Sequence, residues 1–211
     1  MSATAQGAEP TALEPEDQAR ADFYALLARL YASAPDEALL RAIAGAGELP
    51  VASSEDSAKE FACSWGNLVT ASGAVDANVA AEEYQDLFVG VGKSEVSLHA
   101  SSYLKHPGSN LLADLRGELA SLGLGRQPQV SMFEDHLGAV CETMRALIAG
   151  APGMAPAPFP TQRDFFLAFV APWVPQCCAA ISQSPIANYY RRVGEFTQHF
   201  MAIEYESLAI E

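Results

Sequence analysis

The segment Ser131–Leu137 places two acids and a histidine at three consecutive positions, and these residue types can carry out acid–base chemistry. They are Glu134, Asp135 and His136, and Glu142 follows seven residues after Asp135. A histidine oriented by a carboxylate is a common general base. One hypothesis is therefore a hydrolase that uses His136 with Asp135 or Glu142. A second hypothesis is recognition of a ligand by the same side chains.

The same residues also suit the first turn of a helix. Ser131 followed three residues later by Glu134 is the pattern of a capping box, in which both side chains bind backbone N–H groups. Asp135 would then stabilise the positive end of the helix dipole. A protonated histidine would be disfavoured at that end, so helix stability explains the two acids better than it explains His136.

Apolar residues recur at helical spacing through most of the chain. One stripe follows the i, i+3, i+4, i+7, i+8 pattern of an amphipathic helix and consists of Phe23, Leu26, Leu27, Leu30 and Tyr31. Similar stripes predict helices around 39–43 and over about 54–73, 76–88, 111–122, 131–148, 165–173 and 185–210. Alternating β-branched runs, which would indicate strands, are missing. The predicted fold class is all-α, a single helical domain of about eight or nine helices.

Residues 150–160 interrupt the helical pattern with four prolines. Proline cannot continue a helix, so we predict a stiff, extended Pro-rich linker before the C-terminal helices. We expect residues 1–12 to be disordered and residues 13–211 to form the helical domain. The linker could be an ordinary surface loop. It could also let the C-terminal helices pack on a second copy, giving either a monomer or a domain-swapped homodimer.

The composition limits the possible partners. Half of the residues are hydrophobic, enough for a packed core, and 26 acids against 12 bases give a formal net charge of −14. This charge argues against a nucleic-acid partner and favours a basic peptide or protein. No basic start with an apolar segment is visible, so we expect a cytoplasmic protein. No apolar run reaches the roughly 18 residues that cross a bilayer, so we expect no stable membrane insertion.

The sequence predicts no metal site and no cofactor. The histidines and cysteines are dispersed, without HExxH or CxxC spacing: His99, His106, His136, His199, Cys63, Cys141, Cys177 and Cys178. Gly90-Val91-Gly92 follows a predicted helix, whereas a phosphate-binding loop would precede one. We expect the cysteines to be reduced and to act as small buried hydrophobic residues.

Three segments together resemble a known family. Glu134-Asp135-His136-Leu137, followed by Glu142 and Met144, resembles the E-P-x-D-H…E-x-M signature of the TorD/DmsD/NarJ family of redox-enzyme maturation chaperones. Glu83–Phe88, with Ser101-Ser102-Tyr103 after it, is similar to the family's E-Y-x-x-L-F…S-x-Y stretch, and the aromatic segment 165–173 is similar to its C-terminal part. The resemblance covers roughly Phe23 to Ile203. The chain departs from the family at Phe133, near the usual proline.

The resemblance implies an all-helical cytoplasmic chaperone that is not an enzyme. Such proteins bind the N-terminal twin-arginine signal peptide of a molybdenum-cofactor oxidoreductase and assist its cofactor loading before export or assembly. The implied partner is thus the apo-form of a molybdoenzyme catalytic subunit. An all-helical adaptor that binds a folded partner is the alternative.

The family also implies where the peptide would bind. It places Asp135 and His136 in the recognition region, and carboxylates such as Glu82 could take the guanidinium groups of the peptide. Tyr84 and its neighbours could form an apolar wall, although each of these aromatic side chains also fits a plain core position. The candidate peptide-binding residues are Asp135, His136, Glu134, Glu142, Tyr84, Leu87, Phe88, Trp65 and Glu83.

Overall fold

The computed structural model describes residues 13–50, 56–90, 92–104, 111–126 and 132–209 of the chain. The N-terminal segment 1–12, His106 and Ser131 lie outside the described residues, as does the capping box that Ser131 was expected to start. Within the described residues the chain forms nine α-helices and no strand. The prediction of an all-α, single-domain fold is confirmed.

The helices follow the apolar stripes of the sequence. In chain order they are α1 (Pro15–Ala32), α2 (Glu37–Ala44), α3 (Asp56–Ala74), α4 (Ala77–Tyr84), α5 (Leu111–Ser121), α6 (Leu137–Ala149), α7 (Phe159–Phe169), α8 (Val174–Gln183) and α9 (Tyr189–Ala209). A π-helical turn, Gln85–Val89, continues α4, and a 3-10 turn lies at Ala100–Ser102. Among the described helices none is by itself long and apolar enough to cross a membrane, and α7 and α8 meet that test only as a pair bent by 51°.

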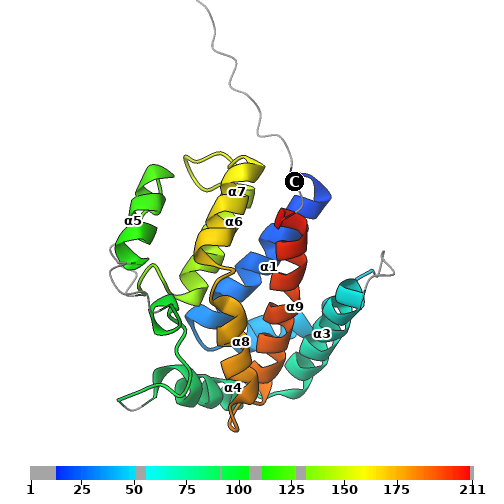
Figure 1. Ribbon diagram of the computed structural model, residues 1–211. Coiled ribbons are helices and arrows are strands. Elements are labelled where there is room, and N and C mark those ends of the chain that lie inside the picture. Colours follow the sequence, from blue (N-terminus) through cyan, green and yellow to red (C-terminus); the bar gives the residue numbers. More distant parts are fainter. Residues whose placement is uncertain (1–12, 51–55, 91, 105–110, 127–131, 210–211) are drawn as a thin grey trace, which may run out of the picture.

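The helices form a bundle in which α1, α6 and α9 run through the middle of Figure 1. α6 packs along α1, while α3 and α8 both pack against α9. In the same view α5 lies at one edge of the bundle and α3 at the opposite edge. The close approach of α6 to α1 depends on Gly138, because a Cβ there would lie 3.1 Å from the carbonyl oxygen of Ala28.

A cluster of aromatic rings forms the core between α1, α3 and α9. The ring of Phe23 lies at its centre, with centroid distances of 5.5 Å to the rings of Phe61, Trp65, Phe196 and Phe200. Aromatic pairs at this separation attract one another beyond the burial of their area. The cluster therefore ties together three helices that are far apart in the sequence.

Two helix starts differ from the prediction. α6 begins at Leu137 and not at Ser131, because His136 caps the helix and the residues before it form a turn. α9 begins at Tyr189 and not near Pro185. In both cases the apolar stripe was located correctly, but the residues that precede it adopt an irregular backbone.

The Pro-rich linker predicted over residues 150–160 is shorter and more compact in the structure. α7 already begins at Phe159, because Pro160 lies in its first turn, where the missing N–H removes no helical hydrogen bond. The backbone N–H of Ala157 donates to the carbonyl of Leu147 at 2.7 Å, so the linker turns back onto α6. The prediction of an extended connection is therefore wrong. The choice between a monomer and a domain-swapped homodimer stays a prediction, which light scattering after size exclusion can test.

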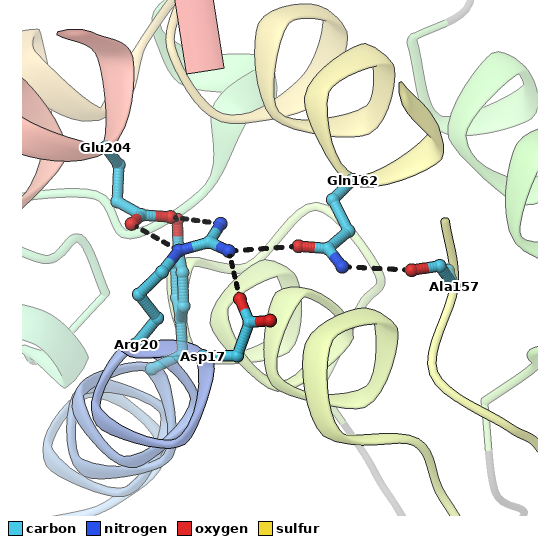
Figure 2. A network of polar contacts seen from close by, with 6 residues as sticks. Asp17, Arg20, Ala157, Gln162 and Glu204 are labelled. Atoms are coloured by element: carbon cyan, nitrogen blue, oxygen red, sulfur yellow. Dashed lines mark hydrogen bonds and ion pairs between the residues drawn. The ribbon is translucent and has the colours of Figure 1, made fainter. Parts of the chain in front are cut away.

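A buried polar network joins α1, α7 and α9 (Figure 2). The guanidinium of Arg20 donates to both carboxylate oxygens of Glu204, at 2.8 and 3.0 Å, and also to Asp17 and Gln162. The hydroxyl of Tyr24 donates to Glu204 at 3.0 Å, and the amide of Gln162 donates to a carbonyl of the linker. We refer to these five residues as the Arg20–Glu204 network.

Candidate functional site

The start of α6 brings together the residues whose types suggested chemistry. Glu134 and Asp135 form a turn before the helix, and His136 is its N-cap residue. Nδ1 of His136 accepts the backbone N–H of Gly138 at 3.1 Å, a position in which serine, threonine, asparagine or aspartate is more usual. Because a backbone N–H can only donate, this nitrogen of His136 carries no proton.

Asp135 holds a second segment of the chain against this turn. One of its carboxylate oxygens lies 3.0 Å from Nδ1 of His99, and the other accepts the backbone N–H of Ser101 at 3.2 Å. The carbonyl oxygen of Asp135 accepts the N–H of Ala100 at 3.0 Å. Asp135 is only 3% exposed as a result. We refer to the group formed by His99, Phe133, Asp135 and His136 as the His99–His136 corner.

Burial and contacts within the corner shift the pKa values of Asp135 and His136. Burial of Asp135 acts to raise its pKa, but the hydrogen bonds from His99 and Ser101 outweigh burial and lower the pKa to about 2. Burial, followed by the nearby charge of His99, lowers the pKa of His136 to about 4. At neutral pH Asp135 is therefore a carboxylate and His136 a neutral imidazole.

The hydrolase alternative required Asp135 or Glu142 to orient His136, and the structure contradicts that arrangement. Asp135 is paired with His99, and Glu142 forms an ion pair with Arg145 at 2.8 Å. Nδ1 of His136 is already bonded to the backbone of its own helix. Within the described part of the chain no carboxylate backs His136 as it would in a general base.

Glu134 has a partner as well. Its carboxylate accepts a hydrogen bond from Arg116 of α5 at 3.0 Å, and this contact lowers the pKa of Glu134 below its ordinary value. The guanidinium of Arg126 lies 5.7 Å from the ring centroid of Phe133, a cation–π contact that also reaches the corner. A guanidinium from a bound peptide would have to displace Arg116 to reach Glu134. The peptide-binding role of Glu134 stays a prediction.

Glu83 caps α9. Its carboxylate accepts the backbone N–H groups of Asn188, Tyr189 and Tyr190 at 2.8, 3.0 and 2.8 Å. The first N–H groups of a helix lack partners within the helix, and the helix dipole favours a negative charge beside them. Glu83 thus joins α4 to α9 in this structure, and contact with a peptide would require it to leave the cap.

The residues predicted to form an apolar wall do not make an open surface. Trp65 belongs to the aromatic cluster and is 7% exposed, and its indole N–H is satisfied by a backbone carbonyl. Tyr84 and Leu87 are buried as well, whereas Phe88 is partly buried with its ring 4.9 Å from that of Tyr190. These side chains belong to the core in this conformation. Their place in a peptide groove stays a prediction that requires the core to open.

Carboxylates without partners lie beside the π-helical turn that follows α4. A hollow of about 320 Å³ is lined there by Gln85, Asp86, Gly90, Lys93, Glu95 and Ile186. Asp86 and Glu95 are exposed and have no hydrogen-bond or ion-pair partner among the described residues. Ile186 is 45% exposed and the nearby Val89 is 52% exposed. This region, the Asp86–Glu95 hollow, offers negative charge and apolar contact at an open surface.

The described residues contain no group of three histidine, cysteine, aspartate or glutamate side chains arranged to hold a metal ion. Cys141, Cys177 and Cys178 are buried free thiols, as expected, but Cys63 is exposed. Burial raises the pKa of Cys177 to about 12, so this thiol stays protonated at neutral pH. Low reactivity of the buried cysteines follows.

Two members of the corner were not among the predicted site residues. His99 pairs with Asp135 across 36 positions of the sequence, and no local pattern indicates such a contact. Phe133 was noted only as a departure from the family's proline, yet its side chain is 50% exposed and its ring lies 6.3 Å from that of His99. The ring thus adds exposed apolar surface beside the polar cluster.

The fold and the corner define an all-helical protein with a polar cluster at the start of a core helix. Residues 54–179, more than half of the chain, match the family described as the nitrate reductase delta subunit, and the chain belongs to this family. No curated protein matches the chain in sequence. The suspected relationship to the TorD/DmsD/NarJ chaperones is confirmed. Family membership supports a general role in molybdoenzyme maturation without catalysis by the chain itself.

Proposed function

We propose that the protein is a cytoplasmic chaperone that binds the N-terminal twin-arginine signal peptide of a molybdenum-cofactor oxidoreductase. It holds the apo-form of that catalytic subunit and assists cofactor loading before export or assembly. The observation that carries this proposal is the family match over residues 54–179, which contains the whole His99–His136 corner and every candidate peptide-binding residue.

The charge distribution supports a cationic and apolar ligand. A twin-arginine signal peptide has a basic start followed by an apolar stretch, and the chain carries a net charge of −14. Opposite charges steer the two molecules together before close contacts form. Asp86 and Glu95 can receive a guanidinium without breaking an existing bond, and Val89 and Ile186 offer apolar contact beside them.

The strength of binding follows from the need for release. A chaperone must release its client once the cofactor is in place. We therefore expect a micromolar dissociation constant, which corresponds to a binding free energy of about −8 kcal/mol. An apolar peptide segment held along a helical surface is compatible with this affinity.

The test is capture of the client from an extract of the cells that make the protein, grown so that their molybdoenzymes are produced. The tagged protein should recover one molybdoenzyme precursor, and deletion of the precursor's N-terminal segment should abolish its recovery. Binding that survives the deletion would favour the adaptor alternative, in which a folded surface is recognised. Recovery of no molybdoenzyme would overturn the proposal.

A further inference from the structure

The two histidines of the corner use Nδ1 in opposite ways: that of His99 donates and that of His136 accepts. Their ring centroids lie 5.0 Å apart with an interplanar angle of 77°. Nδ1 of His99 faces the carboxylate of Asp135 at 3.0 Å, and a carboxylate can only accept, so His99 must carry its proton on Nδ1. On a ring that carries a single proton, Nε2 is then an acceptor.

His136 has the reverse pattern. Its Nδ1 accepts the N–H of Gly138, so the proton of the neutral ring is on Nε2, which is a donor. The environment maintains this state, because burial keeps the ring neutral at pH 7. Side by side, the two imidazoles thus present one acceptor and one donor.

Both of these Nε2 atoms are available to a ligand. Among the described residues neither atom has a hydrogen-bond partner. Neither atom is fully buried, because the buried polar atoms without a partner are all in other residues. The side chain of His99 is 36% exposed, and the exposed ring of Phe133 lies next to it. The corner is therefore a polar site with two ring nitrogens free to form hydrogen bonds, beside an exposed apolar ring.

The pairing of one acceptor with one donor selects the chemistry of the ligand. A guanidinium has only donors and would leave Nε2–H of His136 unpaired, and a carboxylate has only acceptors and would leave Nε2 of His99 unpaired. A neutral amide supplies both an N–H and a carbonyl oxygen. We propose that His99 and His136 hydrogen-bond a neutral amide of the bound peptide, a main-chain amide by preference, while Asp135 is a positioning residue that fixes the acceptor state of His99. This inference rests on the proposed function, since it names what part of the peptide the corner contacts.

The proposal assigns different tasks to different parts of the surface. The corner would hold the peptide by a group that every peptide possesses, with Phe133 excluding water from the two hydrogen bonds. Recognition of the arginine side chains would then fall to carboxylates elsewhere, because the carboxylate of Asp135 is buried and already accepts from His99 and Ser101.

Asp135→Asn tests the positioning role without changing the shape of the corner. The amide oxygen of asparagine can still accept the N–H of Ser101, and its amide nitrogen then donates to Nδ1 of His99. The proton of His99 moves to Nε2 and the acceptor is lost, as happens when the aspartate of a serine-protease triad is replaced by asparagine. Long-range ¹H–¹⁵N spectra of the variant should show the changed tautomer of His99, which a merely structural role would not produce.

His99→Asn tests the contact directly. Asparagine can keep the hydrogen bond to Asp135 but has no atom in the place of Nε2. His199→Asn is the matched control, since His199 lies on α9 with a side chain that is 31% exposed. The probe is a fluorescein-labelled synthetic peptide with the N-terminal sequence of the recovered molybdoenzyme, measured by anisotropy. We expect affinity to fall about tenfold in Asp135→Asn and His99→Asn, the loss of one well-formed hydrogen bond, and to stay unchanged in His199→Asn.

Peptide analogues identify which amide is bound. N-methylation of one main-chain amide should weaken binding to the wild type and have little further effect in His99→Asn, whereas replacement of asparagine or glutamine side chains should have no such coupling. The opposite result would assign the contact to a side-chain amide and overturn the main-chain proposal. If folded Asp135→Asn and His99→Asn bind as the wild type does, the inference fails and the proposed function stands. If the wild type binds no such peptide, both fail.

Discussion

The Arg20–Glu204 network and the His99–His136 corner are both polar clusters set into an apolar bundle, but only one of them is closed. In the network, Arg20 is surrounded by Glu204, Asp17 and Gln162, and Glu204 is 1% exposed. In the corner, Nδ1 of both His99 and His136 is bonded to the protein, while the two Nε2 atoms have no partner among the residues that the structure describes.

This difference distinguishes a polar cluster that stabilises the fold from one that can bind a ligand. A buried charge is tolerated when its hydrogen-bonding capacity is met by the protein, so a closed network positions helices and offers nothing to a ligand. An open cluster uses half of its groups to fix the geometry and leaves the other half for a partner. We therefore expect changes in the network to alter stability alone, and changes in the corner to alter affinity more than stability.

The largest expected effect is that of Glu204→Gln. It breaks the buried ion pair of Arg20 and leaves Asp17, which is more exposed, as the remaining charged partner of the guanidinium. Breaking a buried ion pair costs up to about 3–5 kcal/mol of unfolding free energy. Urea denaturation should measure the loss, and peptide affinity of the folded variant, measured well below its melting temperature, should match the wild type. A normal stability with weakened binding would reverse the roles assigned to the two clusters.

The next effect is the pH dependence of stability that His136 contributes. Its pKa is lowered from 6.5 to about 4 in the folded protein, so between these values the unfolded chain binds the proton more readily. This contribution is fully present above pH 6.5 and is lost as the pH falls toward 4, by about 2 kcal/mol at pH 5.

His136→Asn isolates that contribution, because asparagine also caps helices well. Urea denaturation at pH 7 and pH 5 should give a smaller difference for the variant than for the wild type, by about 2 kcal/mol. An equal difference in the two proteins would mean that His136 titrates normally and that the corner does not hold it neutral.

Local patterns in the sequence predict the helices but not the contacts that build the site. The spacing of Leu27, Leu30 and Tyr31 places α1 and its buried face correctly, because helix periodicity depends on neighbours three or four residues away. The partner of Asp135 lies 36 residues away and the groups capped by Glu83 lie more than 100 residues away. The family motif thus identified Asp135 and Glu83 but not what they touch.

The helix boundaries show the same limit. The start of α6 depends on His136 as a cap, a residue type that capping preferences do not favour, so the Ser131 pattern was the stronger local signal and was wrong. The compact linker depends on the contact of Ala157 with Leu147, which composition does not reveal. Tertiary contacts decide both cases.

Glu83→Ala extends the comparison to a carboxylate first assigned to peptide binding. Loss of three N–H contacts at the start of α9 should cost about 1–2 kcal/mol, or several degrees of melting temperature for a chain of this size. Glu82→Ala is the control, since Glu82 is exposed and has no partner among the described residues. Equal melting temperatures for the two variants would show that Glu83 is not held in the cap.

The smallest expected effect is that of charge in the Asp86–Glu95 hollow. The double variant Asp86→Asn/Glu95→Gln removes two exposed acids, and exposed charges act mainly on the rate of encounter. Stopped-flow association with the signal peptide at low salt should slow by a factor of about two to five, and the difference should shrink as salt screens the charges.

The control Glu14→Gln/Glu16→Gln removes the same charge at the start of α1, which lies at the opposite end of the bundle from α4 in Figure 1. Equal slowing in both variants would mean that the peptide responds to net charge alone. Slower association of the hollow variant alone would place the basic end of the peptide at the Asp86–Glu95 hollow. The main-chain contact at the corner would then be a second, separate point of attachment.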